Sequence, residues 1–232
     1  MIPWLHPKRH DFPPVDQALE SPDGLLAAGG DLSPGRIIAA YRQGIFPWYN
    51  PDEPILWWSP NPRCVLFPQE IHISRSLRKT LRKTAFKITF DQQFDAVINA
   101  CAAPRSYAKE TWISQDMKAA YSALHQLGVA HSVEVWENDT LIGGLYGLAM
   151  GRVFFGESMF SRRTDASKIA FANLVEHLVE WGYDLIDCQV YNDHLASLGA
   201  REIPRSLFID LLGKLLVDRP AHEWTATRRF QS

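Results

Sequence analysis

The sequence predicts an α+β protein in which a mixed β-sheet with helices follows a smaller N-terminal α+β region. Proline and tryptophan crowd roughly the first 60 residues, and this composition favours loops and turns over long regular elements. From residue 131 onward, apolar and polar side chains alternate in a pattern that predicts three strands, a long helix and a further strand. A chain of 232 residues, 46% of them hydrophobic and 22% charged, can bury the core that this fold needs.

One helix is predicted within the N-terminal region. Ser33 can cap it, Pro34 suits its first turn and Gly44 can end it. Three side chains are then expected to pack inward: Ile37, Ile38 and Tyr41.

The segment 74–83 predicts a strongly basic helix with Ser74 as its cap. Leu77 and Leu81 lie on a face that can anchor it to the rest of the protein. Like charges four residues apart destabilise an isolated helix by roughly 0.2–0.5 kcal/mol per pair, so the helix calls for an anionic partner. A face that is merely solvated is the alternative. The cations fall on one stripe: Arg75, Arg78, Lys79, Arg82 and Lys83.

The remaining elements follow from periodicity and from helix stop signals. Helices are expected at 91–102, 115–127, 165–181 and 205–216, strands at 131–137, 140–149, 152–161 and 183–190, and a loosely attached tail at 219–232. We expect an N-terminal region at 1–63, extended by the basic helix to about residue 88 as a domain, and a second domain at 89–232.

Composition excludes several classes of site. Cys64, Cys101 and Cys188 are far apart and suggest neither a disulfide framework nor zinc, and the histidines lack metal-ligand spacing, so neither metal nor cofactor is expected. No apolar run reaches the ~18 residues of a membrane span and no signal peptide is evident, so we expect a cytoplasmic protein. The net charge of −2 means that any nucleic-acid site must be local.

The predicted order of three antiparallel strands, a helix and a crossing strand resembles the core of the N-acetyltransferase (GNAT) superfamily. Enzymes of that superfamily that use acetyl-CoA carry a glycine-rich loop for the donor's pyrophosphate before the long helix. The corresponding connection here, 161–168, contains no glycine. A donor of the CoA type is therefore disfavoured.

Motifs along nearly the whole chain resemble the leucyl/phenylalanyl-tRNA-protein transferase family. They are GLLAAGGDLSP (24–34), GIFPW (44–48), WWSPNPR (57–63), HISRS (72–76), TWI (111–113), AHSVE (130–134), GGLYG (143–147), GESMFS (156–161), ASK (166–168), IDCQ (186–189) and SLGA (197–200). The resemblance implies transfer of Leu or Phe, and weakly Met, from aminoacyl-tRNA to the N-terminal Lys or Arg of an acceptor protein, which marks that protein for N-degron degradation. Aminolysis of an activated ester needs neither ATP nor a metal, so the enzyme must position the reactants, deprotonate the amine and stabilise the oxyanion.

The resemblance also implies catalytic roles for three residues. Alternation places Asp187 and Gln189 on one face of the predicted strand. The carboxylate of Asp187 would orient Gln189, whose side-chain carbonyl oxygen would receive or polarise the hydrogen of the amine. Glu157 would attract the cationic acceptor, and Asn192 would add a hydrogen bond or cap a loop. A structural polar pair at Asp187 and Gln189, a structural salt bridge at Glu157, and proton transfer assisted by the substrate remain alternatives.

The donor site implied by the resemblance is apolar for the amino acid and aromatic for the terminal adenosine. Trp48 and Trp112 would flank the base, and an ordinary core role is the alternative for each pocket residue. Ile186 and Asp187 point to opposite faces of a regular strand, so both can serve one site only if the strand ends or twists there. The implied pocket residues are Leu145, Phe154, Met159, Leu174, Leu178 and Ile186.

The basic stripe would bind the tRNA acceptor stem through backbone charge and shape. A monomer is expected. An acyl-CoA N-acetyltransferase, a non-catalytic module that binds aminoacyl-tRNA, and a related transferase that donates arginine are the rival readings. The last of these would need a carboxylate-lined donor pocket where this chain offers an apolar one.

Overall fold

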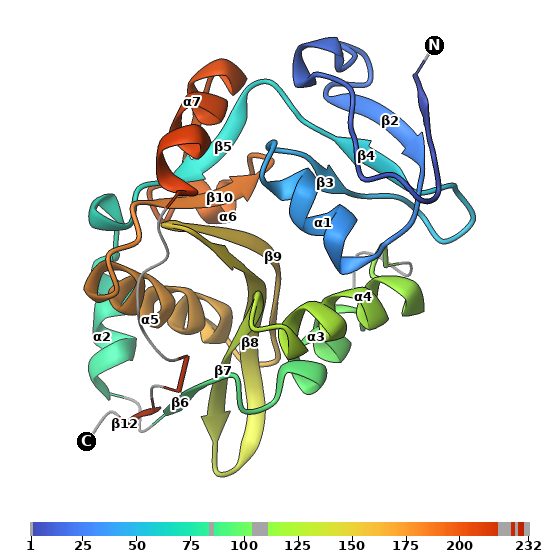
Figure 1. The fold of residues 1–232 in the computed structure, drawn as a ribbon. Helices are drawn as coiled ribbons and strands as arrows, with labels where there is room; N and C mark the ends of the chain where they lie inside the picture. Colours follow the sequence, from blue (N-terminus) through green and yellow to red (C-terminus); the bar gives the residue numbers. More distant parts are fainter. Residues whose placement is uncertain (1, 84–85, 104–110, 218–223, 226, 230–232) are drawn as a thin grey trace.

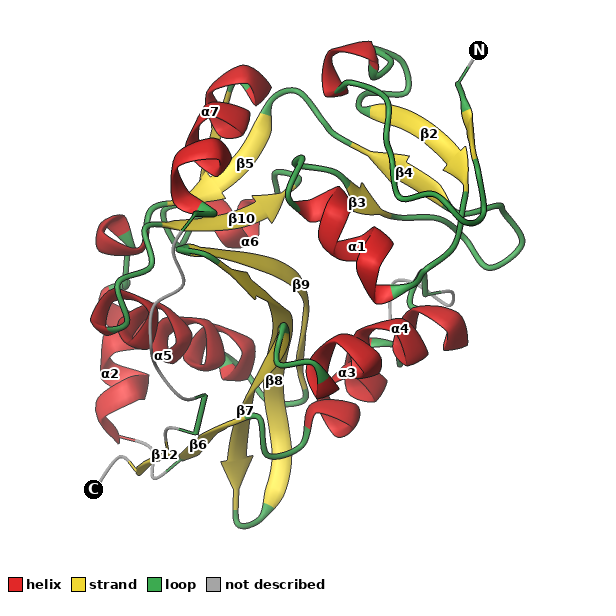
Figure 2. Cartoon of the chain, viewed as in Figure 1, coloured by secondary structure: helices red, strands yellow, loops and turns green. Residues whose placement is uncertain are grey.

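The computed structural model describes residues 2–83, 86–103, 111–217, 224–225 and 227–229. Within them lie two β-sheets with helices around them (Figures 1 and 2), which confirms the α+β class. The smaller sheet has the order β1-β2-β4-β3, with β1 at Trp4–Leu5, β2 at Leu25–Gly29, β4 at Leu56–Trp58 and β3 at Phe46–Pro47. Helix α1, Pro34–Tyr41, lies beside it.

The larger sheet has the order β11-β5-β10-β9-β8-β7-β6-β12 in the described chain. Its strands are β11 Arg201–Ile203, β5 Arg63–Leu66, β10 Leu185–Gln189, β9 Val153–Ser161, β8 Thr140–Met150, β7 Ala130–Glu137, β6 Lys87–Phe90 and β12 Thr227–Arg229. Strand β10 runs parallel to β9, while the other pairings in this sheet are antiparallel, so the sheet is mixed.

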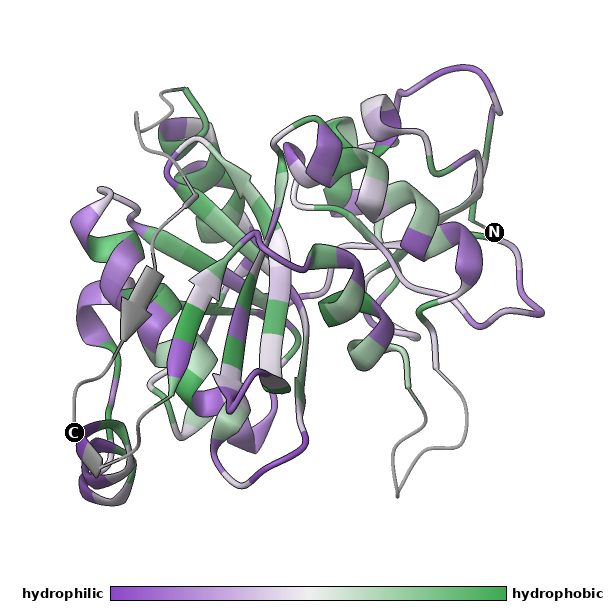
Figure 3. Cartoon of the chain, turned by 90° about the horizontal axis from the view of Figure 1, so that it is seen from below, coloured by the Kyte–Doolittle hydropathy of each residue, from purple (hydrophilic) through white to green (hydrophobic). Residues whose placement is uncertain are grey.

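Helices cover both faces of the larger sheet, as Figure 3 shows from below. Helix α5, Ala166–Glu180, packs on β7, β8 and β9, while α3, Phe94–Cys101, and α4, Gln115–Gln126, pack on the other face. The remaining helices are α2 Arg75–Lys83, which contacts α5, α6 Asp193–Ala196 and α7 Arg205–Leu215, with 3₁₀ turns at Val15–Gln17 and Pro68–Glu70.

Local signals in the sequence account for several of these boundaries. Asn138 and Asp139 both have positive φ, 47° and 60°, as the tight turn between β7 and β8 requires. Gly44, with φ of 73°, follows α1 and allows the chain to reverse. Ser74 caps α2 by accepting a hydrogen bond from the Leu77 N–H at 3.2 Å. Ser33 occupies the N-cap of α1 as predicted, but its side chain makes no capping hydrogen bond.

The C-terminal tail departs from the prediction. Trp224 is buried, with its ring stacked on His131 at a centroid distance of 4.0 Å, and β12 pairs with β6. The prediction of a loosely attached tail is therefore wrong for these residues, because an indole can bury a large apolar area without belonging to a periodic element. The rest of 219–232 lies outside the described residues.

The segment 63–88, grouped above with the N-terminal region, supplies β5, α2 and β6 to the larger sheet and its helical layer. No helix in the described ranges is both long enough and apolar enough to cross a bilayer.

Candidate active site

A cleft of about 1120 Å³ opens where β9 and β10 part. The described pairing between the two strands ends at Asp187 and Phe155. Beyond this point Gly156 and Glu157 of β9, and Cys188 and Gln189 at the end of β10, line the cleft. The separation of two parallel neighbours thus creates a site within the sheet, with backbone and side chains from both strands facing the same space.

The backbone of β10 is irregular at this point. Its pairing with β5 shifts register between Asp187 and Gln189, and Gln189 has φ of 62°, a left-handed conformation that non-glycine residues rarely adopt. Strand β10 therefore bends between Asp187 and Gln189, directly after Ile186, and ends at Gln189. As a result Ile186 and Gln189 both line the cleft, while Asp187 is fully buried outside its lining.

Asp187 forms a buried ion pair with Arg63 of β5. Arg63 Nε donates to Oδ1 at 2.8 Å and Nη2 to Oδ2 at 2.6 Å, and the two side chains are 1% and 0% exposed. Arg63 also donates to the Gly44 carbonyl at 3.1 Å. Oδ1 of Asp187 accepts the Gln189 backbone N–H at 2.9 Å. Asp187 therefore contacts Gln189 through the backbone of that residue, whereas the side-chain amide of Gln189 bonds to Glu157.

Glu157 is the centre of a hydrogen-bond network on the wall of the cleft. Its Oε1 accepts from Tyr41 Oη at 2.6 Å and from Gln189 Nε2 at 3.0 Å, and its Oε2 accepts from Tyr121 Oη at 2.9 Å. The two phenol oxygens are 2.8 Å apart. Four chain segments that are distant in sequence thus meet at one carboxylate.

Burial raises the pKa of Glu157 to about 7, and the negative charge of Asp187 adds to the shift, whereas the hydrogen bonds from Tyr41, Tyr121 and Gln189 oppose it. Burial and the charge of Glu157 also raise the pKa of both phenols well above their ordinary value, so they remain hydrogen-bond donors. A carboxylate that titrates near neutrality is suited to proton transfer.

The Gln189 amide is oriented by Glu157. Because Nε2 donates to that carboxylate, the carbonyl oxygen lies at the other end of the amide. This oxygen accepts no hydrogen bond from the described part of the chain, and Gln189 lines the cleft. An acceptor oxygen is therefore available to a hydrogen of an incoming group.

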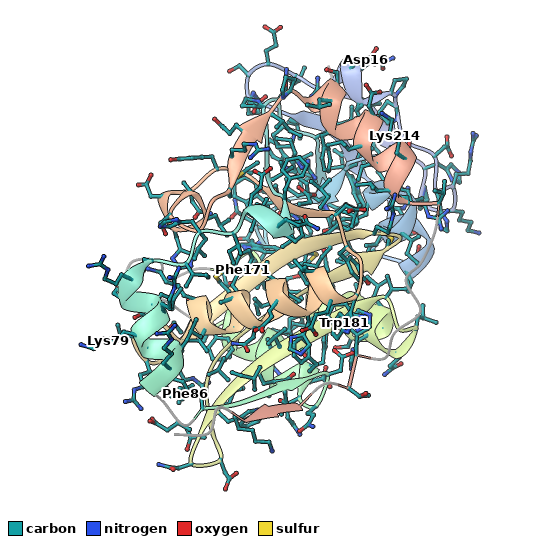
Figure 4. All side chains as sticks on the ribbon, turned by 90° about the vertical axis from the view of Figure 1, so that its left-hand side faces the viewer. Asp16, Lys79, Phe86, Phe171, Trp181 and Lys214 are labelled. Atoms are coloured by element: carbon teal, nitrogen blue, oxygen red, sulfur yellow. The ribbon has the colours of Figure 1, made fainter. Side chains whose placement is uncertain are left out.

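The apolar residues predicted for the donor fall into two groups. Leu145, Phe154, Met159 and Ile186 line the cleft. Two others, Leu174 and Leu178 of α5, are fully buried in the core behind it and are not part of its lining. Helix α5 instead contributes Phe171, labelled in Figure 4, together with Ser167.

The two predicted tryptophans lie on the rim of the cleft. Trp48, 47% exposed, and Trp112 both line it. Trp58 holds Trp48 in place, since its Nε1 donates to the Trp48 carbonyl at 2.6 Å. Trp57, in contrast, is a core residue. Asn192 also lines the cleft, and its Oδ1 caps α6 by accepting the Leu195 N–H at 2.8 Å.

The basic stripe lies on α2, away from the cleft, and Figure 4 shows Lys79 extending from this helix. Arg75, Arg78, Lys79 and Arg82 are exposed, and the side chain of Lys83 lies outside the described set. The stripe is connected to the cleft through the loop after β9. Arg162 lines the cleft, and the next residue, Arg163, places its guanidinium 5.7 Å from the Phe86 ring, just beyond α2.

Sequence reasoning did not find three residues of this site: Tyr41, Tyr121 and Arg63. Tyr41 was predicted only as a core side chain, and nothing in the local sequence marks a phenol that meets a carboxylate more than 100 residues away. Arg63 offered one signal, since an arginine at the start of an apolar strand needs a buried anion. Within the described residues, no group of three or more His, Cys, Asp or Glu side chains is arranged to hold a metal ion.

Comparison with known proteins gives concordant results. The sequence profile described as leucyl/phenylalanyl-tRNA protein transferase matches residues 65–213, and the profile of that family's N-terminal domain matches residues 30–61. The chain is 61% identical to the leucyl/phenylalanyl-tRNA–protein transferase of Pseudomonas syringae pv. syringae over 98% of this chain and 100% of that protein. It is 65% identical to the Nitrosomonas europaea enzyme of the same name over 88% of this chain and 86% of that protein.

Proposed function

Because the chain belongs to the leucyl/phenylalanyl-tRNA protein transferase family, we propose that Glu157 and Gln189 form the reaction centre of an aminoacyl transfer. The enzyme moves Leu or Phe from aminoacyl-tRNA to the N-terminal Lys or Arg of a protein, and the new N-terminus marks that protein for N-degron degradation. The acceptor nitrogen forms a bond to the carbonyl carbon of the ester, and the bond from that carbon to the 3′-terminal ribose oxygen breaks. The tRNA leaves with a free hydroxyl.

The observation that carries this proposal is the Glu157 carboxylate on the wall of the cleft, which accepts a hydrogen bond from the Gln189 amide at 3.0 Å and whose pKa burial raises to about 7. The α-ammonium of a peptide has a pKa of about 7.7–8.0, so proton transfer to Glu157 is nearly balanced in free energy. The Gln189 carbonyl oxygen accepts a second hydrogen of the amine and fixes the direction of attack. Asp187 acts indirectly, because its carboxylate accepts the backbone N–H of Gln189 and so holds that residue in position.

Transfer of labelled leucine from Leu-tRNA to a peptide that begins with Arg tests the activity. A Phe-tRNA arm ranks the two donors, and an Ala-initiated peptide and ribonuclease treatment serve as controls. Absence of transfer by folded protein that still binds tRNA would leave a non-catalytic binding module as the better reading.

The donor amino acid occupies the apolar part of the cleft, against Phe154, Met159 and Phe171. Such a pocket separates side chains that differ by one methylene by only ~1–3 kcal/mol, so Met is a weak donor. Trp48 and Trp112 stack on the terminal adenosine at the rim.

Replacing either rim tryptophan is expected to weaken binding of the aminoacyl-tRNA donor. Stacking of a base on an aromatic side chain contributes about 1–3 kcal/mol, so Trp48→Ala or Trp112→Ala raises the KM for Leu-tRNA about 5- to 150-fold. Trp4→Ala is the matched control, because this indole is 71% exposed and lies outside the cleft lining. An unchanged KM in both rim variants would remove the stacking role.

The acceptor stem of the tRNA runs from the cleft, past Arg162 and Arg163, to the basic stripe on α2. Lys79→Gln is expected to weaken tRNA binding and to reduce the slope of log K against log salt by about 0.7–0.9, the contribution of one phosphate contact. Lys214→Gln removes an exposed lysine from α7, a different part of the surface in Figure 4, and leaves the slope unchanged. Equal slopes in both variants would rule out the stripe as the tRNA contact.

We also propose that the enzyme acts as a monomer in the cytoplasm, where aminoacyl-tRNA is made. Sedimentation of the enzyme at its cellular concentration tests the oligomeric state.

A further inference from the structure

A second pocket, of about 250 Å³, opens beside the cleft. Phe46, Trp48 and Val190 border both spaces, so the two are neighbours. We call the second one the carboxylate pocket, because two acidic side chains line it between aromatic walls. Its other defining residues are Asp23, Trp58, Tyr191 and Glu202.

Glu202 lies in the same row of the sheet as the reaction centre. On β11 it pairs with Cys64 of β5, and on the other side of β5 Cys64 pairs with Gln189 of β10. The backbones of Glu202 and Gln189 are therefore two strand spacings apart, roughly 10 Å. Tyr191 and Glu202 both line the carboxylate pocket, and the charges of Asp193 and Glu202 add to the effect of burial in raising the pKa of this phenol.

Neither of the two carboxylates has a cationic partner among the described residues. In the part of the chain that the structure describes, neither Asp23 nor Glu202 forms a salt bridge, and the only hydrogen bond to Asp23 is from the Asn61 N–H at 3.2 Å. The Trp48 and Trp58 rings stand at 58° to each other, with centroids 5.7 Å apart. Anionic side chains that are free to pair, beside indole faces, match the two ways in which proteins bind ammonium and guanidinium groups.

We infer that the carboxylate pocket receives the cationic side chain of the acceptor's N-terminal Lys or Arg. This inference rests on the proposed function of the cleft, since it places the α-amine of the same residue at Glu157 and Gln189. One residue then spans the two sites, with its amine at the end of β10 and its extended side chain toward β11. The apolar stem of Lys or Arg lies along the aromatic walls, and its charged end reaches the carboxylates. Selection of basic N-termini follows from this second contact.

The test compares peptides that begin with Arg, Lys and norleucine, an uncharged residue with a stem similar to that of lysine. Both carboxylates are solvent-exposed, so each contributes modestly. In Glu202→Gln and in Asp23→Asn, the preference in kcat/KM for Arg over norleucine is expected to fall about threefold, and in the double variant about tenfold. The effect lies in the KM of the basic peptides, while norleucine transfer and the KM for Leu-tRNA are unchanged.

Glu180→Gln is the matched control, because it removes an exposed carboxylate from the end of α5, outside both pockets. A further variant, Glu202→Lys, is expected to reduce transfer to Arg peptides and to improve transfer to a peptide that begins with Glu. An unchanged Arg-to-norleucine ratio in the double variant would overturn the inference and leave the proposed function intact. Failure of the wild-type enzyme to transfer to any peptide would overturn the proposed function instead.

Discussion

In single-turnover assays, kcat/KM for an Arg-initiated peptide is expected to rise with pH through about 7 and then level off, and Glu157→Gln is expected to move this rise to the pKa of the α-amine. Glu157 must be ionised to accept a proton, so the wild-type rate increases with pH through about 7. Above the α-ammonium pKa of about 7.7–8.0 the neutral amine, which is the nucleophile, predominates, so the wild-type rate stays level and does not fall again. The glutamine variant can use only the neutral amine, so its rate rises through that second pKa and then levels off. At neutral pH it is about 10²–10³-fold slower.

Tyr121→Phe provides a control that moves the profile without abolishing it. The phenol donates a hydrogen bond to Glu157, which lowers the pKa of the carboxyl. Loss of this bond raises that pKa, so the rising limb shifts to higher pH. If the rise near pH 7 persisted unchanged in Glu157→Gln, the titrating group would lie elsewhere and the assignment of Glu157 would be wrong.

The second large effect is on stability. Asp187→Ala leaves Arg63 buried without its anion, and breaking a buried pair in this way costs about 3–5 kcal/mol in the free energy of unfolding. The double variant Arg63→Met/Asp187→Leu is expected to recover most of this loss, because an apolar pair of similar volume avoids the cost of a buried charge. Urea denaturation measures both.

Transfer activity separates the two roles of Asp187. The double variant regains stability but still lacks the acceptor for the Gln189 N–H, so its transfer remains slow. Full activity in a stable double variant would show that the position of Gln189 does not depend on Asp187. Slow transfer by an Asp187→Ala variant of normal stability would instead indicate a direct chemical role.

The parts of the fold with a local signal were predictable from the sequence. The alternation in β7, β8 and β9, the turn at Asn138 and Asp139, and the long α5 all match their predicted positions within a few residues. Each of these features depends on residues that are close together in the sequence, so the sequence alone is enough to predict them. The assignment to the N-acetyltransferase superfamily, which concerns descent and not local pattern, stays a prediction.

Contacts between distant segments were not predictable in the same way. The place of β5 beside β10 joins residues more than 100 positions apart, and Tyr41 is equally remote from Glu157, while Tyr121 lies 36 positions from it. The two leucines of α5 show a different limit. Leu174 and Leu178 share a helix face with Phe171, but they lie one and two turns beyond it, where the cleft has already ended. Periodicity gives the face of a helix and not the depth at which a cavity stops.

The hydrogen bond from Tyr41 to Glu157 also bears on how such a protein can change over evolutionary time. The two family profiles divide the chain between residues 61 and 65, yet this bond crosses that division. If either part were exchanged with that of a distant relative, Tyr41 and Glu157 would be replaced by a tyrosine and a carboxylate from different proteins. Those two side chains would not have been selected together. The two parts therefore act as one chemical unit at this carboxylate, although separate family profiles describe them.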